Sequence, residues 1–191
     1  MLSCIRPAIV LLAAMSLLTG VAYPLAVTAI AQFAFPAEAN GSLVSDVGGR
    51  GIGSSLIGQG FTSERYFHSR PSAAGEGYDA ANSGGSNLGP TSAALIATVI
   101  SRAAALGATP GNPVPIDLVT ASASGLDPDI SPQAAAFQVE RVAAARGLEP
   151  ATVHALVRQQ TMGPSLGLFG PPRVNVLLLN LALDRLQSPG G

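Results

Sequence analysis

The chain has 191 residues, of which 48 % are apolar and only 11 % are charged, and its formal net charge is −1. This balance offers no broad basic surface for nucleic acid. All ten cationic residues are arginine, which excludes Schiff-base and P-loop lysine chemistry. Cys4 is the only cysteine, which excludes an intrachain disulfide and a cysteine-based zinc site.

The first feature along the chain is a segment, residues 7–36, that has no charged residue. Since about 20 apolar residues span a bilayer as a helix, we predict a transmembrane helix over residues 7–35, after a short terminus of residues 1–6. Gly20 and Pro24 interrupt it, and Pro24 leaves the Gly20 carbonyl without its usual partner, which favours a kink. The alternative is a cleaved signal peptide ending near "AEA" at 37–39, but the apolar run is about twice the length of a signal-peptide core.

The charges around this segment indicate its orientation. Arg6 precedes it, whereas Glu38 and Asp46 follow. The positive-inside tendency then places residues 1–6 in the cytoplasm and residues 36–191 outside it. Small and polar residues mediate helix contacts in lipid, and on this basis we expect partner helices to contact Gly20, Ala22, Tyr23, Pro24, Ala26, Ala29 and Gln32.

Residues 36–191 are predicted to form one small mixed domain of the α+β class. It opens with two short strands whose cores are "SLV" and "SSLI", around a Gly-rich turn, and residues 71–90 have the composition of a loop. A third strand is expected in "NPVPIDLVTAS".

Four helices are predicted in this domain. The first covers roughly residues 90–106 and ends at Gly107. The second has Ser131 as N-cap, Pro132 as its first residue and Gly147 after its end. The third begins at Pro150, and the fourth is "NVLLLNLALDRL", capped by Asn175; a buried strand over 174–179 is the alternative for its start.

The loop "SGGSNLGPTS" at 83–92 invites comparison with phosphate-binding loops. It lacks the lysine of a P-loop. We therefore expect Gly84 and Gly85 to form a turn, through positive φ angles or close backbone approach, with Pro90 and Thr91 beginning the next helix. The candidate loop residues, for partner contact or for an effect on nucleotide affinity, are Ser83, Gly84, Gly85, Ser86, Asn87, Gly89 and Pro90.

No catalytic or metal-binding constellation is predicted. There is no Gly-x-Ser-x-Gly elbow, and the two histidines, His68 and His154, are expected to be packing or surface residues. The spacing of Asp117, Asp127 and Asp129 does not fit an EF-hand, and these acids are expected in turns. Arg70, Arg141 and Arg173 are candidates to pair with them. The alternative function weighed is a membrane-anchored extracytoplasmic hydrolase using Ser122 or Ser86.

Seven stretches together resemble the C subunit of the bacterial Kdp-type potassium-transporting P-type ATPases. They are "YPLAVTAIAQFAFPAEANGSL", "GSSLIGQGF", "YFHSRPSA", "YDAANSGGSNLGPTS", "PVPIDLVTASASGLDPDISPQAA", "RVAAARGL" and "PPRVNVLLLNLALD". They run in family order from residue 23 to 184, with small departures at Ser92 and Ala123.

The resemblance implies a four-component complex at the bacterial inner membrane. Its other members are a channel-like potassium-translocating subunit, an ATP-hydrolysing pump subunit and a small single-helix subunit. The C subunit is implied to be non-catalytic, with one membrane helix and an extracytoplasmic domain, and to act in assembly and as a "catalytic chaperone" that raises the pump's ATP affinity. In that account residues 83–85 are likened to the signature loop of ABC transporters.

No cofactor of its own is expected for this chain, since the complex handles ATP and potassium. ATP in the cytoplasm cannot reach residues 83–87 if the domain lies outside. Any effect on nucleotide affinity would then pass through the membrane helix and the partner subunits as a coupling free energy. We therefore expect the 83–90 loop to contact a partner.

Overall fold

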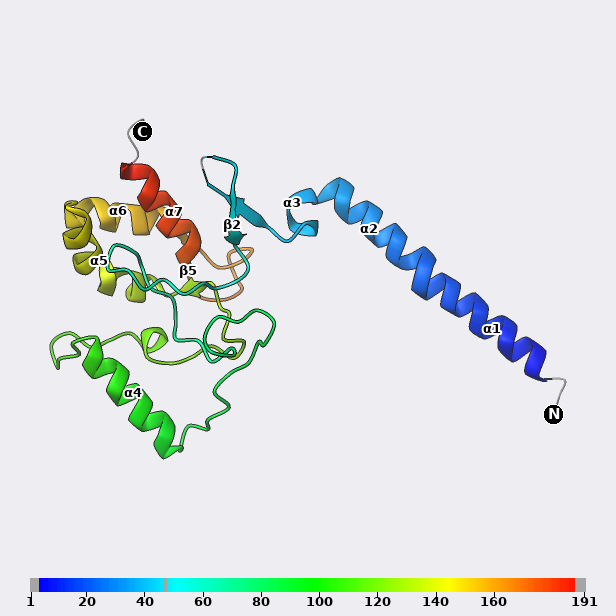
Figure 1. Ribbon diagram of the computed structural model, residues 1–191, viewed down its shortest axis with the longest axis horizontal. Helices are drawn as coiled ribbons and strands as arrows, with labels where there is room; N and C mark the ends of the chain where they lie inside the picture. Colours follow the sequence, from blue (N-terminus) through cyan, green and yellow to red (C-terminus); the bar gives the residue numbers. More distant parts are fainter. Residues whose placement is uncertain (1–3, 47, 188–191) are drawn as a thin grey trace. The chain divides into compact units, whose positions relative to one another are not determined.

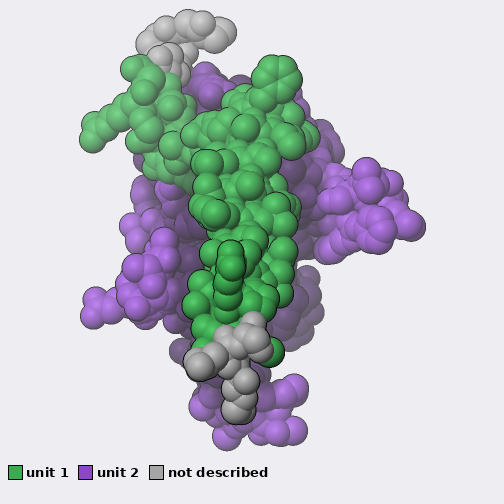
Figure 2. All heavy atoms as spheres, turned by 90° about the vertical axis from the view of Figure 1, so that its right-hand side faces the viewer, with its two compact units in different colours: residues 1–54 green, residues 55–191 purple. Residues whose placement is uncertain are grey.

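The computed structural model describes residues 4–46 and 48–187. The chain divides into two compact units, Met1–Ser54 and Ser55–Gly191, which Figure 2 colours green and purple. Residues 36–54, assigned from sequence to the soluble domain, group with the long helix in this division. The α+β class is confirmed: one long apolar helix precedes a domain of helices and small sheets (Figure 1).

The long helix covers Ile5–Ala34 and is apolar and long enough to cross a membrane, by length and composition. It consists of α1 (Ile5–Leu17), a π-helical turn η2 (Leu18–Ala22) and α2 (Tyr23–Ala34). The Tyr23 N–H donates to the Leu18 carbonyl, five residues back. The interruption expected at Gly20 and Pro24 is thus a π turn, which accommodates the missing proline donor.

After the long helix come a short helix, α3 (Pro36–Ala39), and a hairpin of β1 (Leu43–Ser45) and β2 (Gly51–Ser54). Val44 pairs with Gly53 in antiparallel register. The second strand lies earlier than the predicted core "SSLI", because the Asp46 carboxylate accepts the Gly48 and Arg50 N–H groups and closes the turn at Arg50.

Three helices and a small sheet form the core of the second unit. They are α5 (Pro132–Arg146), α6 (Pro150–Gln160) and α7 (Val176–Gln187), shown from yellow to red in Figure 1. The antiparallel sheet has the order β3 (Asp129–Ile130), β5 (Arg173–Asn175), β4 (Thr161–Met162). The three helices and strands β3 and β5 contribute to one cluster of buried apolar side chains, which includes Phe67, Val139, Val153, Val174, Leu179 and Leu183.

The predicted limits of α5 and the predicted cap of α7 are confirmed. The Ser131 side chain accepts the Ala134 N–H, Pro132 is the first residue of α5, and Gly147 follows it with φ 66°. Asn175 closes β5 and also caps α7, where its side chain accepts the Leu178 N–H at 3.1 Å. The expected helix capped by Asn175 is therefore present, and the alternative of a strand over 174–179 holds only for its first two residues, which belong to β5.

The segment between residues 71 and 128 is mostly irregular. It contains α4 (Ala93–Ala105) and a 3₁₀ turn, η3 (Ile116–Leu118). The start predicted for this helix at Pro90 and Thr91 is wrong, because the Ser92 side chain accepts the Leu95 N–H and caps the helix at Ser92. The strand predicted over 112–122 is wrong. Pro113 and Pro115 cannot donate to a strand ladder, and the Asp117 carboxylate instead accepts the Ser131 N–H at 2.6 Å.

Candidate partner-binding surface

The predicted loop is bound to a second turn of the chain. The Ser83 hydroxyl and the Gly84 N–H both donate to the Ser124 carbonyl, at 3.0 and 2.9 Å. Two donors that a phosphate would need are thus directed at the protein's own backbone. Residues 86–90 of the loop are exposed.

The two glycines of the loop differ in their surroundings. A Cβ added to Gly85 would lie 2.9 Å from the Ala123 carbonyl oxygen, whereas one added to Gly84 would meet nothing within 4 Å. Close approach is therefore confirmed for Gly85. The positive φ considered for both is wrong, since the left-handed residue of this loop is Asn87, with φ 52°.

Several stretches that carry the family resemblance converge on the turn at Gly125. The Ser72 hydroxyl donates to the Gly125 carbonyl at 2.6 Å and accepts the N–H groups of Ala74 and Tyr78. A Cβ on Gly125 would lie 2.6 Å from the carbonyl oxygen of Gly84. These stretches therefore build the scaffold that carries the 83–90 loop and α4.

Two of the expected arginine–aspartate pairs form beside this scaffold. Arg70 contacts Asp127 at 3.0 Å and Arg173 contacts Asp129 at 3.1 Å. Burial and the nearby Asp127 charge raise the pKa of the Asp129 carboxyl. The third expected arginine, Arg141, pairs with Glu64 instead, at 3.4 Å.

A feature that sequence reasoning missed is the way residues 64–69 are held. The Asn180 side chain accepts the Phe67 N–H at 2.8 Å and donates to the Phe67 carbonyl at 3.0 Å. Gln138 does the same for His68, at 2.8 and 3.1 Å. We call this pair of contacts the amide clamp. Its signal in the sequence was a polar residue, Gln138 on α5 and Asn180 on α7, among the apolar residues of each helix.

Two arginines of α5 extend the clamp along the same segment. Arg141 donates to the carbonyls of Glu64 and Tyr66. The buried Arg146 donates to the Arg65 carbonyl at 2.6 Å and pairs with Asp184 at 2.7 Å. Side chains of α5 and α7 thus supply the hydrogen-bond partners that backbone N–H and carbonyl groups of residues 64–69 would otherwise find in a neighbouring strand.

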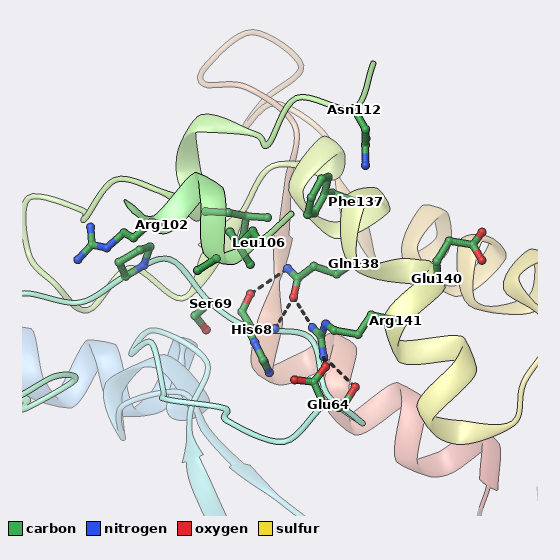
Figure 3. Close-up of a pocket in the computed structure, with 13 residues that line it drawn as sticks. Glu64, His68, Ser69, Arg102, Leu106, Asn112, Phe137, Gln138, Glu140 and Arg141 are labelled. Atoms are coloured by element: carbon green, nitrogen blue, oxygen red, sulfur yellow. Dashed lines mark hydrogen bonds and ion pairs between the residues drawn. The ribbon is translucent and has the colours of Figure 1, made fainter. Parts of the chain in front are cut away.

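A pocket of about 670 Å³ lies beside the clamp, lined by α4, α5 and residues 64–71. Figure 3 shows Gln138 between His68 and Arg141, with Glu64 at the far side of Arg141. Burial lowers the pKa of His68, and its Nε2 lies 3.1 Å from the Ser63 carbonyl. The described residues hold no group of three or more His, Cys, Asp or Glu side chains suited to a metal.

The hydrolase alternative finds no geometric support. Ser122 is buried and Ser86 exposed. Within residues 4–46 and 48–187, neither serine is hydrogen-bonded to a histidine: His68 faces the Ser63 carbonyl and His154 lies on α6. A base positioned for serine activation is a requirement of that chemistry.

The outer face of α4, in the second unit, exposes two large apolar side chains. Ile96 and Ile100, one turn apart, are 51 % and 63 % exposed. The inner face carries the half-buried Leu95 and Val99, and Arg102 attaches it by donating to the Val119 carbonyl at 3.0 Å. Two neighbouring exposed apolar side chains make this face a candidate interaction site.

The residues expected to contact partner helices lie on an exposed helix. Gly20 has no atom within 4 Å of an added Cβ, and Tyr23 is largely exposed. Gln32 is bonded to Asn40 within the same unit, which donates to its side-chain oxygen at 3.1 Å. Contact of this group with partner helices stays a prediction.

Comparison with known proteins supplies the family. The family model described as "K+-transporting ATPase, c chain" matches residues 5–185. The chain is 56 % identical to the potassium-transporting ATPase KdpC subunit of Caulobacter vibrioides, over 99 % of this chain and 96 % of the relative. It is 60 % identical to that of Rhodospirillum rubrum, over 96 % of both chains. It is 57 % identical to that of Methylorubrum extorquens, over 98 % of this chain and all of the relative. A match of this extent shows that the chain belongs to the KdpC family, the c chains of the potassium-transporting ATPases.

Proposed function

We propose that this chain is a non-catalytic subunit that assembles and stabilises a potassium-transporting ATPase and promotes ATP use by its pump subunit. The single observation that carries the proposal is the exposed apolar face of α4, with Ile96 and Ile100, in a chain of this family. The partners are the channel-like potassium subunit, the ATP-hydrolysing pump subunit and the small single-helix subunit.

The proposed place of the soluble unit is outside the cytoplasm. Support comes from Arg6 before the apolar helix and Glu38 and Asp46 after it. A reporter fused after Gly191 is expected to be active only outside the cytoplasm of a bacterial host. A cytoplasmic signal would reverse this orientation and bring residues 83–90 within reach of ATP.

The loop at 83–90 is proposed to contact a partner and not ATP. The donation of Ser83 and Gly84 to Ser124 supports this, because it leaves fewer donors for phosphate. The full chain in detergent is expected to bind ATP no tighter than the millimolar range, about −4 kcal/mol. Saturable micromolar binding by the chain alone would show direct nucleotide contact.

The test of the α4 surface is co-purification of the complex. Ile96→Asp with Ile100→Asp places two charges on the proposed interface, and we expect loss of the pump and channel subunits from a tagged chain. Ile116→Asp is the matched control, since Ile116 is at least as exposed, at 68 %, but lies on η3. Full recovery of the complex with the double variant would contradict the proposal.

The membrane helix supplies a second proposed contact. Gly20→Leu with Ala26→Leu enlarges two small residues and is expected to loosen the complex while the chain still inserts. Comparing this variant with the α4 variant separates the two contacts. Unchanged co-purification would mean that the soluble unit alone holds the chain in the complex.

A further inference from the structure

Residues 163–170, "GPSLGLFG", form a second exposed apolar feature that the proposed function does not use. They lie in the orange segment between α6 and β5 in Figure 1. Leu166 is 93 % exposed, Leu168 78 % and Phe169 62 %. Three large apolar side chains in four residues, at such exposure, are not explained by the fold of the unit itself.

The loop is wound tightly and does not depend on these side chains for its shape. Ser165 and Phe169 exchange two backbone hydrogen bonds, at 2.8 and 2.9 Å, and the Gly167 N–H donates to the Pro164 carbonyl at 3.0 Å. Leu166 at the tip has φ 55°, a left-handed backbone that a bulky residue adopts only under strain. Leu166 therefore presents its side chain outward at the cost of local strain.

The charges around the loop favour one kind of surface. Residues 150–183 contain no acidic residue. Arg173, which follows the loop, is paired with Asp129, whereas Arg158 is exposed at the end of α6. An apolar tip that is preceded in the chain by an exposed arginine suits the boundary of an anionic bilayer.

Chain connectivity keeps a bilayer within reach. Only residues 35–54 separate the end of the apolar helix from the soluble unit. Even a fully extended linker of this length reaches roughly 70 Å at ~3.5 Å per residue. A tether of this kind raises the effective concentration of the lipid surface, so a weak contact suffices.

We propose that residues 163–170 are a lipid-contacting loop, which inserts Leu166, Leu168 and Phe169 into the interface of the membrane that anchors the chain. The proposal does not depend on which side of the membrane the soluble unit lies, nor on α4. The proposed partner of residues 163–170 is the bilayer surface. Contact with a groove on another subunit is the alternative that the test distinguishes.

The sequence contains no tryptophan, so a Phe169→Trp variant gives a single fluorescent probe in the loop. The full chain is placed in vesicles of phosphatidylcholine and phosphatidylglycerol, with or without brominated lipid. We expect brominated lipid to quench most of the indole emission and acrylamide in the water to quench little of it. Ile100→Trp is the matched control and is expected to show the reverse in vesicles without other subunits.

Two further variants sharpen the result. Adding Leu166→Asp and Leu168→Asp to Phe169→Trp removes only exposed side chains, and we expect the indole to become open to acrylamide. Adding Arg158→Gln is expected to reduce the quenching by brominated lipid less than the double aspartate does. An indole open to acrylamide in vesicles, or shielded only after the pump and channel subunits are added, would overturn the proposal.

Discussion

Helices α4 and α5 are similar in length, 13 and 15 residues, but opposite in burial. Helix α4, "AALIATVISRAAA", has one charged residue and buries none of its side chains. Helix α5 has three charged residues and buries Gln138 and Arg146 among its apolar ones. The more polar helix lies in the core, where its polar groups bind the backbone of residues 64–69, whereas the outer face of α4, with Ile96 and Ile100, is exposed.

The largest expected difference between the core around α5 and the exposed helix α4 comes from truncating one apolar residue in each. Leu179→Ala on α7 removes a fully buried side chain beside α5 and is expected to lower the free energy of unfolding by about 2–5 kcal/mol. Ile100→Ala on α4 is expected to change it by less than about 0.5 kcal/mol. Urea unfolding of the full chain in detergent measures both. Equal losses would mean that α4 belongs to the core.

A second variant tests whether the amide clamp is what makes polar residues stabilising in this core. Asn180→Ala leaves the buried Phe67 N–H and carbonyl without their partners, and we expect a loss of about 2–4 kcal/mol. Asn112→Ala, outside the clamp, serves as control. A change at Asn180 no larger than at Asn112 would show that the clamp adds nothing to stability.

A third pair of variants compares neighbours in the 83–90 loop, on the α4 side of the unit. Gly85→Ala brings a Cβ to 2.9 Å from the Ala123 carbonyl oxygen and is expected to destabilise by about 1–3 kcal/mol. Gly84→Ala meets open space and should stay within about 0.5 kcal/mol of the parent. Thermal unfolding distinguishes them. Equal sensitivity, accompanied by loss of ATP binding, would instead favour the phosphate-loop hypothesis.

The smallest expected effect is the pH dependence of the clamped segment. Burial lowers the pKa of His68 in the folded chain below 6.5, so the unfolded chain binds a proton first as the pH falls. Stability contributed by neutral His68 is therefore present above pH 6.5 and is lost on acidification below it. His68→Gln should reduce the change in the urea unfolding midpoint between pH 7.5 and pH 5. An unchanged slope would contradict the assignment to His68.

Local signals predicted much of this fold. Ser131, Pro132 and Gly147 gave the limits of α5, Pro150 gave the start of α6, and Asn175 gave the cap of α7, because capping depends on a few adjacent residues. The interruption at Pro24 was predicted for the same reason, although its form, a π turn, was not.

Contacts between distant residues were beyond such signals. The strand expected over 112–122 is replaced by a 3₁₀ turn, in which the Leu118 N–H donates to the Pro115 carbonyl. The Asp117 carboxylate accepts the Ser131 N–H, a contact that no pattern within the segment reveals. The clamp joins Phe67 to Asn180, and the environment of Gly85 depends on Ala123. For the candidate surface, the sequence placed α4 but not its exposure, since exposure depends on what packs against a helix.

The amide clamp also has a consequence for the time course of synthesis. Its bonds join residues 70 and 113 positions apart. At a translation rate of about 5–20 residues per second, Asn180 is made roughly 6–23 seconds after Phe67. During that interval the membrane helix is already complete, while the backbone of residues 64–69 lacks the hydrogen-bond partners that α7 will provide. A nascent chain is therefore expected to be most vulnerable to proteolysis at this segment, until its last helix arrives.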